Sequence, residues 1–264
     1  MNTILITGAS SGIGQASALY FAKEGWNVIA GMRHPQEDRK LSDIENIHKI
    51  KLDITKQEDI DHTYDYVMEH GGLDVLYNNA GISVKGGLES IPSEAIHSVF
   101  ETDLFGPIAL MQKFIPYFKN KESGVILATS SLSGLISFPY DGIYAGAKRA
   151  LEGVMESLYY EMLPYHVKVK TIVPGPVNTS LKMQTYTSQT NLKPAKNLSK
   201  ILIPDFNAFP EASDVAKVVY EAATSETNQF EYIVGSVANE LLAQRQSEGL
   251  ESFKDSLAEK IYKQ

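Results

Sequence analysis

The chain has 264 residues, 43% of them hydrophobic, which suits one α/β domain with a large core. Its 24 basic and 32 acidic residues give a formal net charge of -8, so it offers no basic surface to a nucleic acid. It contains no cysteine, which excludes disulfides, thiolate metal ligands and a cysteine nucleophile.

The N-terminal segment MNTILITGAS shows neither the basic leader nor the small-residue cleavage pattern of a secretory signal. No apolar run approaches the roughly 18 residues that suggest a membrane-spanning helix. We therefore expect a soluble, cytoplasmic protein without a membrane partner, and we predict no metal site.

Short β-branched segments alternate with longer amphipathic segments along the chain. We predict strands at Thr3 to Thr7 and in NVIAGM, IHKIKLDI, LDVLYN, GVILATS, VKVKTIV and FEYIVG. Helices are predicted in IGQASALYFAKEG, in KQEDIDHTYDYVMEH, and around residues 93–118 and 142–163. Apolar strands that alternate with helices indicate a doubly wound α/β fold, a Rossmann-type parallel sheet with helices on both faces. Residues 1–264 are expected to form one such domain.

Two segments interrupt this alternation. Residues 180–210 are polar, contain prolines and lack a sustained period, so we predict a substrate lid there. Its apolar residues suggest a hydrophobic substrate, or else pack the lid on the body: Leu181, Met183, Leu202, Ile203 and Phe206. The last segment, about residues 237–264, has apolar positions at helical spacing and is predicted to cover the site or a partner subunit.

A glycine-rich turn follows the first strand directly. In TGASSGIG, from Thr7 to Gly14, three glycines permit positive φ and let main-chain amides approach a pyrophosphate at a helix N-terminus. The spacing differs from the commoner G-x-G-x-x-G, but the strand before and the helix after supply the context of a dinucleotide site. The predicted contacts are Gly8, Ser10, Ser11, Gly12, Ile13 and Gly14.

The end of the second strand indicates which dinucleotide binds. An NAD site usually places an acidic side chain there, against the ribose 2′-hydroxyl. The segment AGMRHP has no carboxylate and offers Arg33, whose guanidinium matches a 2′-phosphate. A solvent-exposed arginine with no ligand is the alternative. The sequence favours NADP(H), with NAD less favoured.

Four motifs occur in order along the chain: TGASSGIG, NNAG at Asn78 to Gly81, a serine in SSLSG, and YAGAK at Tyr144 to Lys148. In this ordered set the chain resembles the classical short-chain dehydrogenases/reductases over nearly its whole length. Agreement at LDI, at PGPVNT and in GLISFPYDGIYAGAKRALEG resembles the hydroxysteroid-dehydrogenase-like branch. The resemblance implies an enzyme that binds a nicotinamide cofactor and acts on a small-molecule carbonyl or alcohol.

The resemblance also implies roles for further residues in cofactor binding. It assigns Asp53 and the backbone of Ile54 to the adenine edge. It assigns the turn Asn79, Ala80 and Gly81 to the adenosine ribose, and Pro174, Val177 and Thr179 to the nicotinamide half. For the NNAG turn, a tight turn at the end of a strand is an alternative that is compatible with binding.

Tyr144 and Lys148 are four positions apart (148 − 144), which places them on one face of a helix. Such a pair is also common on exposed helices. The resemblance makes Tyr144 the acid/base that moves a proton at the carbonyl oxygen during hydride transfer. We expect the Lys148 ammonium to lower the pKa of the phenol from its ordinary value of about 10. The resemblance adds a contact between Lys148 and the nicotinamide ribose.

A serine is expected to hold the substrate oxygen. Ser131 lies thirteen positions before Tyr144 (144 − 131), at the end of the strand GVILATS, where its hydroxyl can stabilise developing charge. Because a strand alternates its faces, only one of Ser130 and Ser131 should point into the site. The family spacing favours Ser131, with Ser130 and then Ser133 as alternatives.

One position departs from the family pattern. Classical members carry an asparagine in N-x-x-G after the NNAG turn, where it helps to hold a water linked to the lysine. The matching stretch here is ETDLFG, with Asp103 at that position. An aspartate lacks the amide donor and, if ionised, adds negative charge near Lys148.

These patterns predict an NADP(H)-dependent oxidoreductase that interconverts a carbonyl and a secondary alcohol. A cofactor-binding sensor or scaffold with little turnover is the alternative that Asp103 suggests, and a nucleotide-sugar epimerase or dehydratase is less compatible with the short chain.

The family usually self-associates through the helices around residues 93–118 and 142–163, so we expect a homo-oligomer. Candidate contact residues, which could equally face the sheet, are Phe105, Ile108, Leu151 and Val154.

Overall fold

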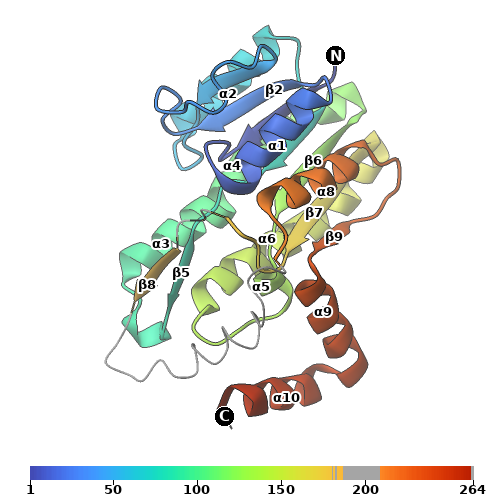
Figure 1. The fold of residues 1–264 in the computed structure, drawn as a ribbon. Helices are drawn as coiled ribbons and strands as arrows, with labels where there is room; N and C mark the ends of the chain where they lie inside the picture. The colour runs from blue at the N-terminus through green and yellow to red at the C-terminus, as the bar shows by residue number, and fades with distance from the viewer. Residues whose placement is uncertain (180, 182, 187–208, 263–264) are drawn as a thin grey trace.

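The computed structural model describes residues 1–179, 181, 183–186 and 209–262 (Figure 1). Its centre is a seven-stranded parallel sheet in the order β3-β2-β1-β4-β6-β7-β9. In chain order the strands are β1 Thr3–Thr7, β2 Asn27–Met32, β3 Ile47–Lys51, β4 Val75–Asn78, β6 Gly124–Thr129, β7 Val167–Pro174 and β9 Glu231–Val234. The predicted Rossmann-type fold is confirmed. The strand order reverses between β1 and β4, which is where sheets of this kind bind ligands.

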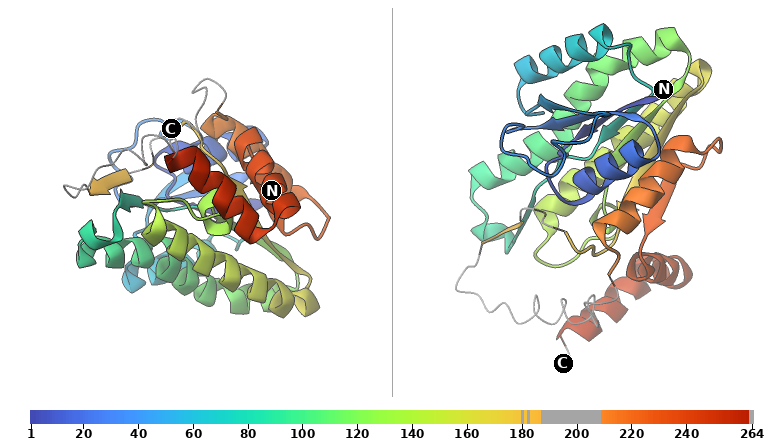
Figure 2. Two further views of the ribbon diagram at one scale, coloured as in Figure 1. Left: turned by 90° about the horizontal axis from the view of Figure 1, so that it is seen from below. Right: turned by 45° about the horizontal axis from the view of Figure 1, so that its top comes forward.

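Helices cover both faces of the sheet (Figures 1 and 2). α1 Gly12–Lys23 and α8 Ala212–Thr224 lie on one face, and α2 Gln57–Glu69, α4 Gly106–Lys121 and α6 Gly142–Met162 lie on the other. Side chains alternate along a strand, so β1 contributes to both cores. Ile4 and Ile6 belong to the core that includes Phe21 of α1, and Leu5 belongs to the core that includes Phe114 of α4. The continuous apolar strands are thus explained by burial on two sides.

The helix predicted around residues 93–118 is interrupted in the structure. α3 Ser93–Phe100 is followed by a π-helical turn, Glu101–Phe105, before α4 begins. A π turn holds one residue more than an α turn, and such turns are frequent at functional sites. Asp103 and Leu104 of this turn are both buried. Asp103, a charged residue of this turn, therefore lies in the interior.

A small parallel sheet lies beside the main one. It pairs β5 Ser83–Gly86 with β8 Met183–Tyr186, a strand that the sequence pattern does not predict. A Cβ on Gly86 would lie 2.5 Å from the Tyr186 carbonyl oxygen, so the two strands approach closely at that glycine. β8 falls within the predicted lid of residues 180–210. Most of that lid, including Leu202, Ile203 and Phe206, lies outside the described residues.

Two further helices follow β9: α9 Ser236–Glu248 and α10 Leu250–Tyr262, which extend away from the sheet (Figure 1). They share a small core with the segment after β6, which includes the short helix α5 Leu132–Leu135. The buried residues of this core are Leu132, Ile136, Phe138, Ala238, Phe253, Leu257 and Ile261. The helices predicted near the end of the chain therefore pack against the segment that directly follows Ser131. Short 3₁₀ turns at Leu88–Ser90 and Leu163–Tyr165 complete the described fold.

Candidate active site

The predicted site residues come from segments at one edge of the sheet. All strands of a parallel sheet end at the same edge, so the segments after β1, β4, β6 and β7 meet there. They carry the glycine-rich turn, the NNAG turn, Ser131 and the PGPVNT segment. α6 reaches the same edge, because Lys148 Nζ donates to the carbonyl oxygen of Thr129, the last residue of β6, at 2.9 Å.

The glycine-rich turn has no room for a side chain at two positions. A Cβ on Gly8 would lie 2.8 Å from Ala80 Cα, and a Cβ on Gly14 would lie 2.5 Å from the Gly8 carbonyl oxygen. Gly12, at the start of α1, has φ +55°, in the left-handed region that favours glycine. The other predicted contacts of this turn are Ser10 and Ser11, which are exposed, and Ile13, which is partly buried. The turn therefore presents main chain, and the N-terminus of a helix, to an anion.

Thr7, the last residue of β1, joins the glycine-rich turn to the NNAG turn. Its hydroxyl oxygen accepts from the main-chain N–H groups of Asn79 and Ala80, each at 2.9 Å. The Asn79 amide nitrogen donates to the Thr7 carbonyl oxygen at 2.9 Å, and its amide oxygen accepts from Thr129 Oγ1 at 3.3 Å. The Asn79 side chain thus fixes the turns around the predicted ribose position. The sequence prediction omits Thr7 and Thr129, although both stand at strand ends beside quoted motifs.

Asp53 and Ile54 follow β3 at the predicted adenine end. Ile54 is buried, and a Cβ on Gly106 would lie 2.8 Å from its carbonyl oxygen, so α4 begins against this segment. Asp53 Oδ1 accepts from the Thr55 N–H at 3.1 Å and from the Thr55 hydroxyl at 2.7 Å. Asp59 of α2 holds the Asp53 main-chain N–H at 2.9 Å. Asp59 was not predicted from sequence, and it supports this turn from outside the site.

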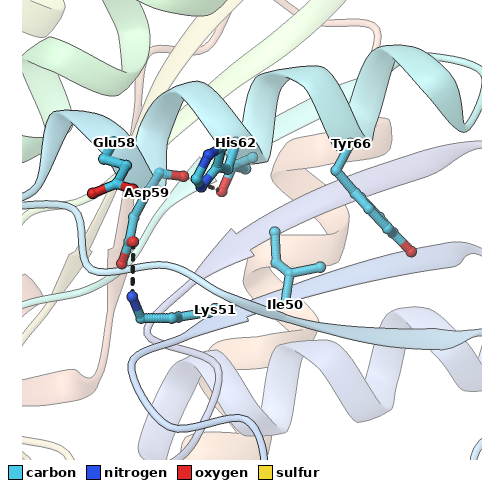
Figure 3. Close-up of a pocket in the computed structure, with 7 residues that line it drawn as sticks. Ile50, Lys51, Glu58, Asp59, His62 and Tyr66 are labelled. Atoms are coloured by element: carbon cyan, nitrogen blue, oxygen red, sulfur yellow. Dashed lines mark hydrogen bonds and ion pairs between the residues drawn. The ribbon is translucent and has the colours of Figure 1, made fainter.

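A hollow of about 320 Å³ lies between β3 and α2. Asp59 is one of the residues that line it (Figure 3). Lys51 Nζ donates to Asp59 Oδ1 at 3.0 Å across it. Burial raises the pKa of Asp59, but the Asp53 N–H and the Lys51 ammonium outweigh burial and leave that pKa below its usual value. The hollow is lined by residues of β3 and α2 alone, so it is separate from the site at Tyr144 on α6.

Arg33 directly follows β2 and is exposed. Within the described ranges its side chain makes no hydrogen bond or ion pair, so the guanidinium is available to a ligand. Asp38, later in the same connection, accepts from the Leu41 N–H at 2.9 Å and lies 3.8 Å from Lys49 Nζ. The Asp38 carboxylate is therefore engaged by its own loop and by β3.

The PGPVNT segment leads from β7 back over the glycine-rich turn. Pro174 is buried at the end of β7, and Val177 packs against the core on the α1 side of the sheet. A Cβ on Gly12 would lie 3.6 Å from Thr179 Cβ. The structure therefore brings Thr179 next to the turn predicted to hold the pyrophosphate.

The structure separates the two neighbouring serines at the end of β6. Ser130 is buried, and its hydroxyl has no hydrogen-bond partner among the described residues. Ser131 is partly exposed, its Oγ accepts from the Ser133 N–H at 3.1 Å, and its side chain lowers the pKa of the Tyr144 phenol. Of the two hydroxyls, that of Ser131 is the one beside Tyr144.

Tyr144 and Lys148 lie on one face of α6, as their spacing predicts. Lys148 Nζ is 5.7 Å from the centre of the Tyr144 ring. The same nitrogen is 3.1 Å from Asp103 Oδ2, and the two side chains of this ion pair are 3% and 0% exposed. Asp103 Oδ1 accepts from the Ile82 N–H at 2.9 Å. Asp103 therefore pairs directly with the lysine of the site.

The charged residues of the site favour a neutral phenol. Burial raises the pKa of Tyr144, Lys148 lowers it and Asp103 raises it, with a net pKa above the ordinary value. Burial lowers the pKa of Lys148, but Asp103 and Tyr144 outweigh burial and favour the ammonium. Burial raises the pKa of Asp103 against the opposing effect of Lys148. Lys148 thus lowers the pKa of the phenol, as predicted, but burial and Asp103 outweigh it in the chain without cofactor.

Comparison with known proteins shows what the chain is similar to. Residues 2–190 match the family model for short chain dehydrogenases. Human 17-beta-hydroxysteroid dehydrogenase type 1 is 30% identical over 237 residues, which cover 86% of this chain and 70% of that protein. A short-chain dehydrogenase from Streptomyces avermitilis has a TM-score of 0.84 at 29% identity, covering 98% of this chain and 96% of that one. ElxO with NADP bound has a TM-score of 0.75 at 27% identity, covering 88% of this chain and 97% of that one.

Proposed function

The chain belongs to the short chain dehydrogenase family of oxidoreductases, and on that premise we propose that it interconverts a carbonyl and a secondary alcohol with NADP(H). One observation carries the proposal: the Tyr144 phenol adjoins both the Ser131 hydroxyl and the buried Lys148 ammonium. Carbonyl reduction needs from the protein a proton donor, a hydrogen-bond donor for the oxygen and a fixed positive charge. These three side chains can supply them.

The residues of the sheet edge fit a dinucleotide. The bare main chain around Gly8 and Gly14 suits a pyrophosphate at the start of α1. We assign Asp53 and Ile54 to the adenine. The other assigned contacts are Asn79, Ala80 and Gly81 at the adenosine ribose, and Pro174, Val177, Thr179 and Lys148 at the nicotinamide half. When bound, the nicotinamide supplies or accepts the hydride.

In reduction, Ser131 donates a hydrogen bond to the carbonyl oxygen while that oxygen gains negative charge. Tyr144 transfers its phenolic proton to the same oxygen, which becomes the alcohol hydroxyl, while the hydride that reduced nicotinamide would supply goes to the carbonyl carbon. Lys148 stabilises the phenolate that remains. In oxidation the phenolate takes the proton from the alcohol, and Ser131 holds the oxygen in both directions.

The electrostatics of the site support reduction as the favoured direction. Burial and Asp103 raise the pKa of Tyr144, and the Lys148 charge offsets them only in part. A phenol that keeps its proton near neutrality is a ready acid and a poor base. The chain is therefore better suited to donate a proton to a ketone than to remove one from an alcohol.

The preference for NADP(H) rests on Arg33. It follows β2, is exposed, and has no partner within the described ranges, while no carboxylate ends this strand. A 2′-phosphate would place two negative charges near this guanidinium, which a 2′-hydroxyl would not. That ElxO binds NADP is consistent with this choice.

The ion pair between Asp103 and Lys148 also supports a second candidate, a cofactor-binding sensor or scaffold with little turnover. Lys148 Nζ lies 3.1 Å from Asp103 Oδ2, so the lysine's charge is partly neutralised before it acts on the phenol. Such a protein would bind the cofactor and leave carbonyl compounds unchanged.

The quaternary structure and the lid complete the proposal. We propose a homo-oligomer built on α4 and α6, with Phe105, which is 51% exposed, available for the contact. Leu151 is excluded because it lies in the core. The lid over residues 180–210 and a cytoplasmic location remain proposals; no helix in the described part of the chain has the length and apolar character needed to cross a membrane. Light scattering at micromolar protein concentration tests the oligomer, and the mass of a monomer would contradict it.

The deciding experiment is a panel of carbonyl compounds offered to the protein with NADPH and, separately, with NADH. Turnover is followed by the absorbance of the reduced cofactor. Ketones of increasing apolar size, including a steroid ketone, test whether the substrate is hydrophobic. Binding of NADPH without turnover of any compound would favour the sensor or scaffold, and turnover only with NADH would reject the cofactor assignment.

A further inference from the structure

Ser133 and Asp141 form a buried side-chain pair across the connection between β6 and α6. The Ser133 hydroxyl donates to Asp141 Oδ2 at 2.6 Å, and the two residues are 9% and 6% exposed. The main-chain N–H of Ser133 donates to Ser131 Oγ at 3.1 Å. Ser131 in turn lies beside Tyr144 and lowers the pKa of its phenol. Hydrogen bonds therefore run from Asp141 through Ser133 to Ser131, the residue next to the proposed proton donor.

Helix capping does not account for Asp141. The residue stands directly before α6, where an aspartate often caps the helix by accepting from a main-chain N–H of the first turn. The Asp141 side chain makes no such bond, and its Oδ2 accepts from Ser133 instead. Its Oδ1 is buried and has no hydrogen-bond partner among the described residues. The carboxylate is thus used to hold the loop rather than the helix.

The bond from the Ser133 amide determines how Ser131 can act. A serine hydroxyl has one proton to donate and two lone pairs that accept. The Ser133 N–H occupies one lone pair of Ser131 Oγ. The position of the Ser133 amide therefore restricts the directions in which the other lone pair and the hydroxyl proton of Ser131 can point. If the segment that carries Ser133 moved away, this bond would be lost and the Ser131 hydroxyl could rotate.

We propose that Asp141 is a positioning residue of the reaction: through Ser133 it fixes the turn that carries Ser131, and so keeps the Ser131 hydroxyl directed at the reacting oxygen. The inference rests on the proposed function, because it concerns the same site. Ser133 acquires a distinct role as the link between the carboxylate and Ser131.

The charge of Asp141 has a second effect that a variant can separate from positioning. Burial raises the pKa of Asp141, while the Ser133 hydrogen bond and the Lys85 ammonium of β5 lower it. The Asp141 charge is one of those that raise the pKa of Tyr144. Asp141→Asn removes this charge but keeps an oxygen that can accept from Ser133, whereas Asp141→Ala removes both.

The kinetic test measures kcat and KM for a ketone taken from the panel, in Asp141→Ala, Asp141→Asn and Ser133→Ala, each with and without Ser131→Ala. Misplacement of a reacting group should lower kcat by about tenfold to a hundredfold in Asp141→Ala and Ser133→Ala. Asp141→Asn should retain most of kcat and move the basic limb of its pH profile to lower pH. With Ser131→Ala present, the further loss should vanish, since no hydroxyl is left to position. Equal losses in both backgrounds would overturn the proposal.

A second measurement does not depend on turnover. Hydrogen exchange of the amides in residues 131–141 should speed up in Asp141→Ala and Ser133→Ala, and stay near wild type in Asp141→Asn. Asp74→Ala is the control, because Asp74 accepts from the Thr3 N–H at 2.8 Å at the start of the sheet strands, far from this loop in the fold. Unchanged exchange of the loop would overturn the positioning role even if the enzyme is active. Inactivity of the wild type toward every compound would reject the proposed function alone.

Discussion

Lys148 Nζ lies 3.1 Å from Asp103 Oδ2 in the interior of the protein. A Cβ on Gly81 would lie 2.9 Å from the same Asp103 oxygen, so the NNAG turn closes over the pair. The carboxylate stabilises the ammonium and opposes a negative phenolate nearby. Asp103 therefore acts on Tyr144 through charge as well as through the lysine.

Asp103→Asn should move the basic limb of kcat/KM for reduction to lower pH. Asp103 raises the pKa of Tyr144, so without its charge the phenol loses its proton at lower pH and reduction fails earlier. The rate at neutral pH should change by less than about tenfold, or ~1.4 kcal/mol in barrier. The pH dependence of kcat/KM measures the limb. A limb that stays in place or rises would contradict the assigned role of Asp103.

Asp74→Asn is the matched control for that experiment, since it removes a carboxylate from the opposite edge of the sheet and should leave the limb unchanged. One result of the carbonyl panel would reject the proposed enzymatic function. If the wild type is inert toward the carbonyl panel and Asp103→Asn becomes active, the natural protein is the sensor or scaffold.

Tyr144→Phe should reduce kcat by about a hundredfold or more, because the variant lacks the proton that the phenol transfers but keeps the ring. Its affinity for NADPH should change little. Lys148→Ala should impair both kcat and NADPH binding, since the lysine is proposed to contact the ribose as well as to act on the phenol. Steady-state kinetics and fluorescence titration with NADPH separate the two effects. Near wild-type turnover by Tyr144→Phe would refute the mechanism.

Wild-type protein should bind NADPH at least tenfold more tightly than NADH, a difference of about 1.4 kcal/mol. Arg33→Ala should reduce the ratio, and Arg33→Asp should reduce it further, because a carboxylate repels a 2′-phosphate and can accept from a 2′-hydroxyl. Titration of both cofactors against each variant tests this. Arg39→Ala, which alters another exposed arginine of the same loop, is the control. Equal wild-type affinities would reject the NADP(H) preference.

Gly14→Ala and Gly153→Ala should have opposite effects on stability. A methyl group at Gly14 would lie 2.4 Å from Asn79 Nδ2 and 2.5 Å from the Gly8 carbonyl oxygen, so the turns must separate and NADPH binding should be lost. At Gly153, in the middle of α6, nothing lies within 4 Å of the added Cβ. Alanine there should stabilise the helix by about 0.5–1 kcal/mol. Urea unfolding and NADPH titration measure both, and a stable, NADPH-binding Gly14→Ala would contradict the account of the turn.

Glu152→Gln should stabilise the protein at neutral pH and lose that advantage in acid. Glu152 is 8% exposed, and its carboxyl oxygens have no hydrogen-bond partner among the described residues. Burial is the largest effect and raises its pKa; Ser130 lowers the pKa, Glu231 raises it, and Thr171 and Lys148 lower it, with a net pKa above the usual value. The pKa of Glu152 in the folded protein lies above its unfolded value of about 4.3. The stabilising contribution of Glu152 is therefore complete below a pH of about 4.3 and is lost as pH rises through the folded pKa.

Urea unfolding of wild type and Glu152→Gln across this pH range tests the prediction. The difference in free energy of unfolding should grow with pH and level off above the folded pKa of Glu152. Glu156→Gln, one turn further along α6 at an exposed position, is the matched control. A difference that does not vary with pH would show that Glu152 titrates alike in the folded and unfolded chain.

Much of this protein follows from local patterns in its sequence. The apolar strands and amphipathic helices predict the doubly wound sheet. A strand buried on both faces is apolar throughout, whereas a helix buried on one face has apolar residues at helical spacing. The spacing of Tyr144 and Lys148 puts both on one helix face. The glycine-rich turn after β1 predicts a main-chain site for an anion, since few other residues permit such a turn. Each of these inferences depends only on neighbours along the chain.

Tertiary structure decided the features that depend on contacts between distant segments. A π turn inside a predicted helix brings Asp103 to Lys148, although 45 positions (148 − 103) separate them in sequence. The same holds for the choice between Ser130 and Ser131, and for the bond from Ser133 to Asp141. Burial and a buried countercharge then set the pKa of Tyr144 above its usual value, against the expectation from Lys148 alone. Solvent exclusion and the distances between charges arise only when the segments pack, so a sequence pattern could name these residues but not the balance of forces among them.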